Sequence, residues 1–189
     1  LAIVEIAPNV QKILFLAFFA SLAIKFPIFP FHTWLPTAHM EAPVSASIIL
    51  SSLLLKMGGY GFIRIVLPIL PDAVEYFSSL MLILGSIAII YASLVALMQK
   101  DIKRLIAYSS IAQMGFVLIG IFSNNILSLQ GAVIQMISHA AIVAGLFLSF
   151  GIIHDRIGKS EIDKYGGICQ VMPKFSFIFM ILVFAAIGI

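Results

Sequence analysis

Apolar runs long enough to cross a lipid bilayer as helices follow one another along this sequence. A membrane-spanning helix needs about 20 mostly apolar residues. Five runs reach this length, at 13–36, 44–67, 74–98, 102–122 and 126–153. A sixth opens at Pro173 and continues to Ile189. Charged residues make up only 10% of the 189, against about 25% in soluble domains, so we predict an all-α membrane protein with five transmembrane helices and a truncated sixth.

Short polar joints separate these runs. They lie at 37–43, 68–73, 99–104, 123–125 and 154–173. Even the last of them is too short to hold a soluble domain. Because the sequence begins at Leu1 without a charged leader region, and its sixth run is cut short, we expect it to be part of a longer membrane protein.

Positive charge is concentrated in the joints that follow the third and fifth runs and in their flanks. The residues concerned are Lys100, Lys103, Arg104, Arg156, Lys159, Lys164 and Lys174. Alternating crossings put both joints on one side of the membrane, together with the joint 37–43. Basic residues mark the side that is not translocated, so this side is predicted to be the bacterial cytoplasm or the mitochondrial matrix.

Four polar residues stand near the middle of their runs, where hydrocarbon should surround them. Lys25, Lys56 and His139 each lie about twelve or thirteen residues into a segment, and Gln113 lies at a comparable level. At ~1.5 Å per residue this depth is ~18–20 Å, near the bilayer midplane. A lysine there costs at least ~2.5–3.5 kcal/mol, so two of them in separate helices indicate a function.

This arrangement predicts a lateral row of proton carriers. Burial disfavours the charged form of a lysine, and histidine titrates near neutral pH. Lys25, Lys56 and His139 can therefore exchange protons, while Gln113 holds a water between them. The alternative is a static role, in which the lysines pair with buried carboxylates to specify packing. No acidic residue stands in the middle of a run, so such partners would have to lie outside this sequence.

Proline interrupts the first run directly after its lysine. Pro27 and Pro30 remove backbone donors from the helix. Broken helices at membrane depth occur against protein or water-filled cavities, and they recur at transporter binding sites. We therefore predict a break near Lys25, and a second one near His139 in the small-residue stretch "MISHAAIVAG". The alternative for each is a plain kink of a membrane helix.

The other polar and glycine-rich groups indicate less. His32, His39 and Glu41 have a spacing that matches no zinc pattern, so we interpret them as hydrogen-bonding partners within the joint or as a candidate proton entry for Lys25. The glycines of "GGYG" (58–61) are expected to allow close helix packing. A single cysteine, Cys169, excludes an internal disulfide and any cluster of cysteine ligands. No basic stripe with interleaved aromatics indicates nucleic-acid binding.

Several stretches resemble one family. "KFPIFPFHTWLPTAHMEAP" (25–43) and "LLLKMGGYGFIR" (53–64) are similar to the antiporter-like proton-pumping membrane subunits of respiratory complex I, NADH:quinone oxidoreductase. Within that group the residues of these motifs favour the subunit M type, called subunit 4 in mitochondria. "IAYSSIAQMGF" (106–116), "ISHAAIVAGLF" (137–147) and "YGGI" (165–168) extend the resemblance over nearly the whole chain.

The resemblance implies a bundle of about fourteen helices with two inverted five-helix repeats, each containing one broken helix. Residues 1–70 would then hold the last two helices of the first repeat, and 71–189 the first part of the second. Lys25 matches the family's central lysine, Lys56 the lysine that links the two half-channels, and His139 the histidine of a later helix. Gln113 departs from the family pattern, which often has a histidine there.

The resemblance also implies a function and partners. The chain would translocate protons in a bacterial or mitochondrial inner membrane, driven by quinone reduction elsewhere in the complex. Its partners would be other membrane-arm subunits, the lipid bilayer and internal water. NADH, FMN, iron–sulfur clusters and quinone would be bound by other subunits, with no cofactor or metal in this chain. The alternatives are a subunit of a multisubunit sodium/proton antiporter or membrane-bound hydrogenase, and a passive membrane scaffold.

Overall fold

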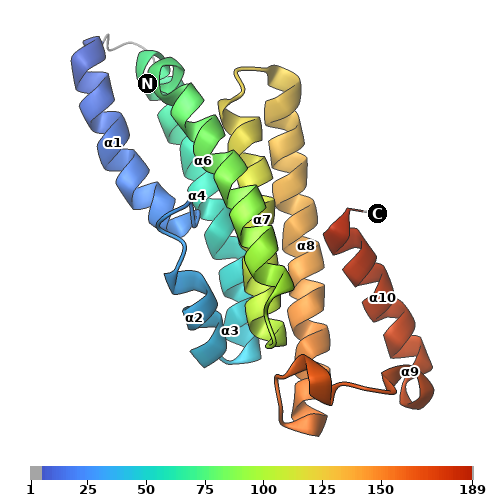
Figure 1. Cartoon of the computed structure of the whole chain (residues 1–189). Helices are drawn as coiled ribbons and strands as arrows, with labels where there is room; N and C mark the ends of the chain where they lie inside the picture. Colours follow the sequence, from blue (N-terminus) through green and yellow to red (C-terminus); the bar gives the residue numbers. More distant parts are fainter. Residues whose placement is uncertain (1–5, 189) are drawn as a thin grey trace.

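The computed structural model describes residues 6–188, and this part of the chain is built from helices without a β-strand (Figure 1). The separate helices are α1 (Pro8–Lys25), α2 (Trp34–Glu41), α6 (Pro71–Leu97), α7 (Ile102–Phe122), α8 (Ile126–Ile157), α9 (Ile168–Val171) and α10 (Pro173–Ile187). A short 3₁₀ turn, η3 (Ile162–Lys164), lies between α8 and α9. The all-helical prediction is confirmed.

One further helix runs without interruption from Val44 to Ile69, but its geometry changes along its length. It consists of α3 (Val44–Ile49), the π-helical turn η1 (Leu50–Leu54), α4 (Leu55–Gly61), the π-helical turn η2 (Phe62–Val66) and α5 (Leu67–Ile69). π-Helical turns widen a helix locally and occur frequently at functional sites. The apolar pattern of the sequence did not predict them.

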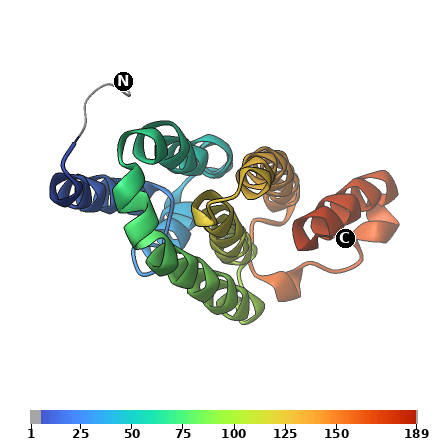
Figure 2. The same cartoon turned by 90° about the horizontal axis from the view of Figure 1, so that it is seen from above.

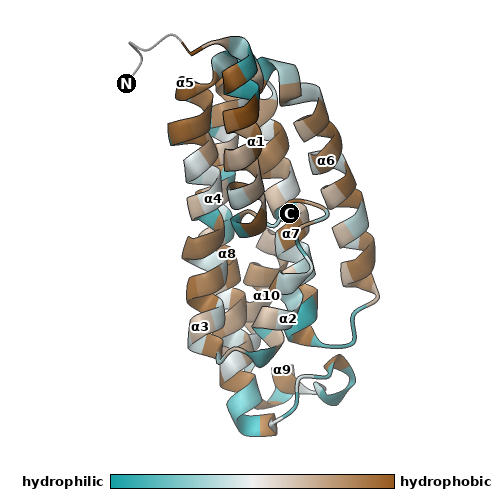
Figure 3. Ribbon diagram, turned by 90° about the vertical axis from the view of Figure 1, so that its left-hand side faces the viewer, coloured by the Kyte–Doolittle hydropathy of each residue, from teal (hydrophilic) through white to brown (hydrophobic). Residues whose placement is uncertain are grey.

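Within residues 6–188, four helices are long and apolar enough to cross a membrane. They are Val44–Ile69, Pro71–Leu97, Ile102–Phe122 and Ile126–Ile157. Figure 3 shows apolar residues along the helix bodies and hydrophilic residues gathered towards the ends of the bundle. α10 is shorter and apolar, and it begins with Pro173 in its first turn, as predicted.

The first predicted crossing is made of two helices. The run 13–36 was expected to form a single interrupted helix followed by a polar joint at 37–43. Instead, α1 begins earlier, at Pro8, and ends at Lys25, and α2 occupies most of the expected joint. Prolines explain these boundaries, because Pro27 and Pro30 cannot continue α1, whereas Pro36 lies in the first turn of α2, where its missing donor costs no bond.

The break predicted near His139 is absent, and this prediction was wrong. α8 is one continuous helix from Ile126 to Ile157. This stretch contains no proline, and its small residues serve packing. A Cβ atom added at Gly145 would lie 2.9 Å from Leu182 of α10, and one added at Gly151 would lie 2.8 Å from Val44 of α3. The glycines therefore let neighbouring helices approach α8.

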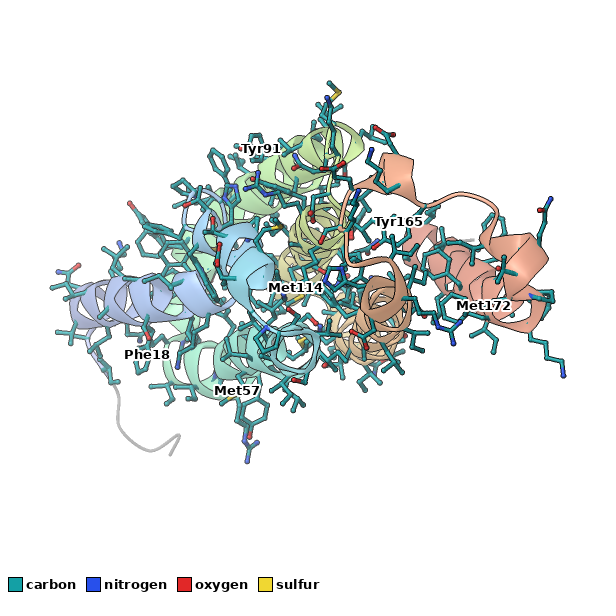
Figure 4. The ribbon with its side chains drawn as sticks, turned by 90° about the horizontal axis from the view of Figure 1, so that it is seen from below. Phe18, Met57, Tyr91, Met114, Tyr165 and Met172 are labelled. Atoms are coloured by element: carbon teal, nitrogen blue, oxygen red, sulfur yellow. The ribbon has the colours of Figure 1, made fainter. Side chains whose placement is uncertain are left out.

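α7 forms the centre of the bundle. It packs against α6, α8 and α2, and Figure 2 shows it between neighbouring helices while α10 lies at the edge of the molecule, against α8. Figure 4 shows Met114 of α7 among the helices and Met57 of α4 pointing outward, in agreement with exposed fractions of 1% and 62%. Stacked and edge-on phenylalanine rings fill the core around Phe15, Phe62 and Phe122.

The turns that carry the basic residues lie at one end of the bundle. The α2–α3 turn, the α6–α7 turn and the segment between α8 and α10 are all at the lower end of Figure 1. This arrangement agrees with the predicted alternation of crossings. Which side of the membrane this end faces stays a prediction. One of these basic residues, Lys103, is not a solvated surface charge, because only 8% of it is exposed.

Candidate functional site

The break between α1 and α2 is held against α4. Phe26, the first residue after Lys25, packs onto the glycine pair of α4, where a Cβ atom added at Gly58 would lie 2.8 Å from the Cβ atom of Phe26. Across the break, the indole Nε1 of Trp34 donates a hydrogen bond to the carbonyl oxygen of Ile24 at 3.0 Å. The predicted break near Lys25 is confirmed, and so is the packing role of the glycines.

Lys25 is the last residue of α1, and its side chain is exposed. A cation in the last turn complements the negative end of the helix dipole. Within residues 6–188, no side-chain hydrogen bond or ion pair involves its ammonium group. The prediction that Lys25 is buried is therefore not met within residues 6–188, where its side chain is exposed at the end of α1.

Lys56 and His139 contact each other, although their helices are far apart in the sequence. The Nζ atom of Lys56, on α4, lies 2.7 Å from Nδ1 of His139, on α8. The same Nζ donates to the carbonyl oxygen of Ser51 at 2.6 Å, within the π-helical turn η1. His139 is buried, and its Nε2 has no partner in the described part of the chain. The sequence predicted a row at one depth with Gln113 as the bridge, whereas Lys56 and His139 contact each other directly.

This contact constrains the protons that the two groups can carry. An ammonium and an imidazolium would both donate, and two donors cannot form a hydrogen bond with each other. A short contact therefore requires one neutral partner, either a neutral imidazole that accepts at Nδ1 or a neutral amine that accepts from Nδ1–H. The two states differ by movement of one proton along the bond. The arrangement is chemically suited to proton transfer.

A cavity of about 510 Å³ opens beside His139, between α7, α8 and α10. Its polar lining residues are Ser109, Gln113, Ser128, Gln135, Ser138 and His139. Gln135 donates from Nε2 to Oε1 of Gln113 at 2.7 Å. Gln113 in turn donates from Nε2 to the carbonyl oxygen of Ala186 in α10 at 3.0 Å. Gln113 and His139 thus line the same polar wall of one cavity.

The three candidate entry residues do not form one group. His32 is buried beside the rings of Phe29 and Tyr91. His39 is buried and stacked on Phe147, with the ring centroids 4.8 Å apart. Neither imidazole has a hydrogen-bond partner among the described residues, so the expected hydrogen bonds within the joint are not found there. Glu41, at the end of α2, is exposed.

Sequence reasoning missed Gln135, Ser51 and Lys103. Gln135 stands four residues before His139, a spacing that puts both on one face of a helix, so this partner could have been found. The carbonyl oxygen of Ser51 carries no signal in the sequence. Lys103 was counted only among the basic residues that set the orientation, yet its Nζ donates to the carbonyl oxygens of Met40, in the last turn of α2, and of Ala42, its C-cap. No group of three or more His, Cys, Asp or Glu side chains suited to a metal ion occurs within residues 6–188.

These features define a class of protein: a polytopic helical membrane protein with a broken helix and a partly buried lysine–histidine pair between two of its helices. The particular family follows from the sequence. The chain belongs to the family described as "NADH:quinone oxidoreductase/Mrp antiporter, TM", whose sequence profile matches residues 3–189.

Individual relatives agree with this assignment. The chain is 51% identical to NADH-quinone oxidoreductase subunit M of Rickettsia prowazekii, over 99% of this chain and 39% of that protein. It is 50% identical to NADH-ubiquinone oxidoreductase chain 4 of Chondrus crispus, over 94% of this chain and 36% of that protein. The chain thus spans about two fifths of the length of these curated relatives.

Solved structures share the fold. One chain of the structure "Respiratory complex I from Thermus thermophilus with bound NADH" superposes with a TM-score of 0.93 and 32% identity, over 98% of this chain and 40% of that chain. A chain of the Mrp complex from Dietzia sp. DQ12-45-1b superposes with a TM-score of 0.86 and 25% identity, over 92% of this chain and 32% of that chain.

Proposed function

We propose that this chain is part of a proton-translocating membrane-arm subunit of an NADH:quinone oxidoreductase. Family membership and relatives of about half identity that are named as subunits of that enzyme support this proposal. In this role the chain works with other membrane-arm subunits in a bacterial or mitochondrial inner membrane. Other subunits bind NADH, FMN, iron–sulfur clusters and quinone, and this chain holds no redox centre.

The observation that carries the proposal is the contact between Lys56 and His139 at the wall of a polar cavity. A proton passes between these two groups, and the buried Nε2 of His139 has no hydrogen-bond partner among the described residues. Gln113 and Gln135 line the same cavity and hold water there. Lys25 is the second lysine station, at the end of the half-helix α1.

The exposed ammonium of Lys25 is directed towards the remainder of the subunit. Charge pairing with a carboxylate there would favour the protonated lysine, and loss of that pairing would favour release of the proton. The division of this chain between two inverted repeats, at residue 70, belongs to the same proposal. α6 starts at Pro71, next to that boundary.

The test uses the complete subunit in its complex, reconstituted in sealed vesicles. Lys56→Met and His139→Ala are each expected to lower the number of protons moved per NADH oxidised, because each removes one partner of the pair. Lys100→Met, which removes an exposed lysine in the α6–α7 turn, is the matched control and should pump like the parent. Variants at 56 and 139 that assemble and pump at the parental ratio would refute the proposal.

The family also includes Mrp-type antiporters, so sodium/proton exchange is the second candidate function. The structure from Dietzia is only 25% identical, whereas the relatives near 50% identity are named as oxidoreductase subunits, and these favour the first candidate. Sodium-driven proton movement across vesicles without NADH would identify an antiporter instead. Unchanged pumping on loss of both Lys25 and Lys56 would identify a passive scaffold.

A further inference from the structure

Lys103 is a buried lysine that the proposed proton route does not use. It lies in the first turn of α7, and only 8% of it is exposed. Its Nζ donates to the carbonyl oxygen of Ala42 at 2.9 Å and approaches that of Met40 at 3.4 Å. Both carbonyls belong to the C-terminal end of α2 and its cap. Lys103 therefore connects the centre of the bundle to the second half of the broken helix.

Helix physics explains why an ammonium group suits this place. The last carbonyls of a helix lack intrahelical donors, and they carry the negative end of its dipole. A buried lysine in turn needs acceptors for its protons. No carboxylate within residues 6–188 bonds to Lys103. The contact therefore satisfies the end of α2 and the ammonium together, and hydrogen bonds to a charged donor are stronger than neutral ones.

The start of α7, which carries Lys103, is itself held in place by hydrogen bonds. The Oδ1 atom of Asp101 accepts from the backbone N–H of Arg104 at 3.1 Å and so caps α7. Ile102 donates its N–H to the carbonyl oxygen of Ser160 at 3.1 Å, and Ile162 donates to that of Lys100 at 2.9 Å. These backbone bonds tie the start of α7 to the segment after α8.

α2 is also anchored by packing against α7, with Leu35 and His39 fully buried. Its first residue bonds to the end of α1 through the indole of Trp34, and its last turn rests on α8 through the stacking of His39 on Phe147. Between α1 and α2 lie eight residues without an α-helix, 26–33. The orientation of α2 consequently sets how the chain passes through the break next to Lys25.

We propose that Lys103 is a positioning residue that holds α2 in place through its terminal carbonyls and thereby fixes the geometry of the break beside Lys25. The ammonium acts on the proton route only through α2. This inference extends the proposed function, but the hold on α2 can be measured without any pumping.

Hydrogen exchange in the complete complex tests the hold directly. In Lys103→Met, the amides of residues 34–42 are expected to exchange about tenfold faster or more, because a bond to a charged donor is lost. Lys103→Arg should keep parental protection, because a guanidinium also donates to carbonyls. Arg104→Met removes an exposed cation from the same turn and should leave 34–42 unchanged. Lys103→Gln, which loses charge and reach, replaces the Met variant if that one does not assemble.

Proton pumping is the second measurement. Lys103→Met should move fewer protons per NADH oxidised at equal amounts of assembled complex, and Lys103→Arg should restore the ratio. The inference would be overturned if residues 34–42 of the neutral Met or Gln variant exchanged at the parental rate. It would also be overturned if Lys103→Arg exchanged as fast as the neutral variants. If the parent complex pumps no protons but Lys103→Met still exchanges faster at 34–42, the proposed function is rejected and the hold on α2 stands.

Discussion

At the scale of single residues, the two lysines of the proposed route occupy different surroundings. Lys56 is engaged twice, by His139 and by a backbone carbonyl, whereas Lys25 points out of the described bundle. Removing Lys56 leaves a buried histidine without its partner, and such a loss costs about 1–3 kcal/mol. Removing Lys25 breaks no side-chain hydrogen bond or ion pair within residues 6–188. Substitution of Lys25 should therefore report on function alone, whereas substitution of Lys56 should also lower the stability of the fold.

Lys25→Ala should leave assembly largely intact and reduce proton pumping about tenfold or more, since it removes a proton carrier without disturbing packing. Lys25→Arg should not restore pumping, because a guanidinium stays protonated and cannot exchange its proton. The measurement is the pumping rate per assembled complex in vesicles. Normal pumping by an assembled Lys25→Ala complex would remove this residue from the route.

Gln113 allows a second test at this scale. Gln113→Leu leaves both the amide of Gln135 and the carbonyl of Ala186 without their partner, and it makes the cavity wall apolar, so pumping should slow. Gln113→His should be tolerated, because imidazole can hold a water or carry the proton itself. Both variants are compared by pumping rate at equal complex content. If Gln113→Leu assembles and pumps like the parent, the path leaves the cavity before residue 113.

At the scale of helices, the glycine pair of α4 decides where the break can lie. Gly58→Ala places a Cβ atom 2.8 Å from that of Phe26, with backbone of the same residue at 3.0 Å. Neither can move away cheaply, so a destabilisation of about 1–3 kcal/mol is expected. Gly131→Ala in α8 meets nothing within 4 Å and should be neutral or stabilising. Thermal stability of the assembled complex distinguishes the two variants, and equal melting would contradict a tight contact.

The helices also show what the sequence can and cannot predict. Apolar length identified the spans from Val44 to Ile157, and proline identified the end of α1, because both act locally. A break at His139 was wrongly predicted since small residues beside a polar one also serve helix packing. Equal depth placed Lys56 and His139 in one row, but the sequence did not predict their direct contact. The π-helical turns and the burial of Lys103 depend on tertiary contacts, so no local sequence pattern predicts them.

At the scale of the whole molecule, the basic end of the bundle fixes its predicted orientation. The turns that carry most of the lysines and arginines lie at one end (Figure 1), and the start of α6, with Asp72 and Glu75, lies at the other. Basic residues stay on the untranslocated side. The end that holds α2, the start of α7 and the segment 158–172 should therefore face the cytoplasm or the matrix.

Cys169 is the single cysteine of these 189 residues and is exposed in α9, so it reports this orientation once the label is assigned to its peptide. In sealed vesicles, a membrane-impermeant thiol reagent should label it only from the cytoplasmic or matrix side. Cys169→Ser combined with Glu75→Cys moves the thiol to an exposed position at the start of α6, and labelling should then come only from the opposite side. The pair controls for leaky vesicles, since leakage would label both variants from both sides. Exchanged labelling of the two positions would invert the assignment, and with it the direction in which protons enter towards Lys25.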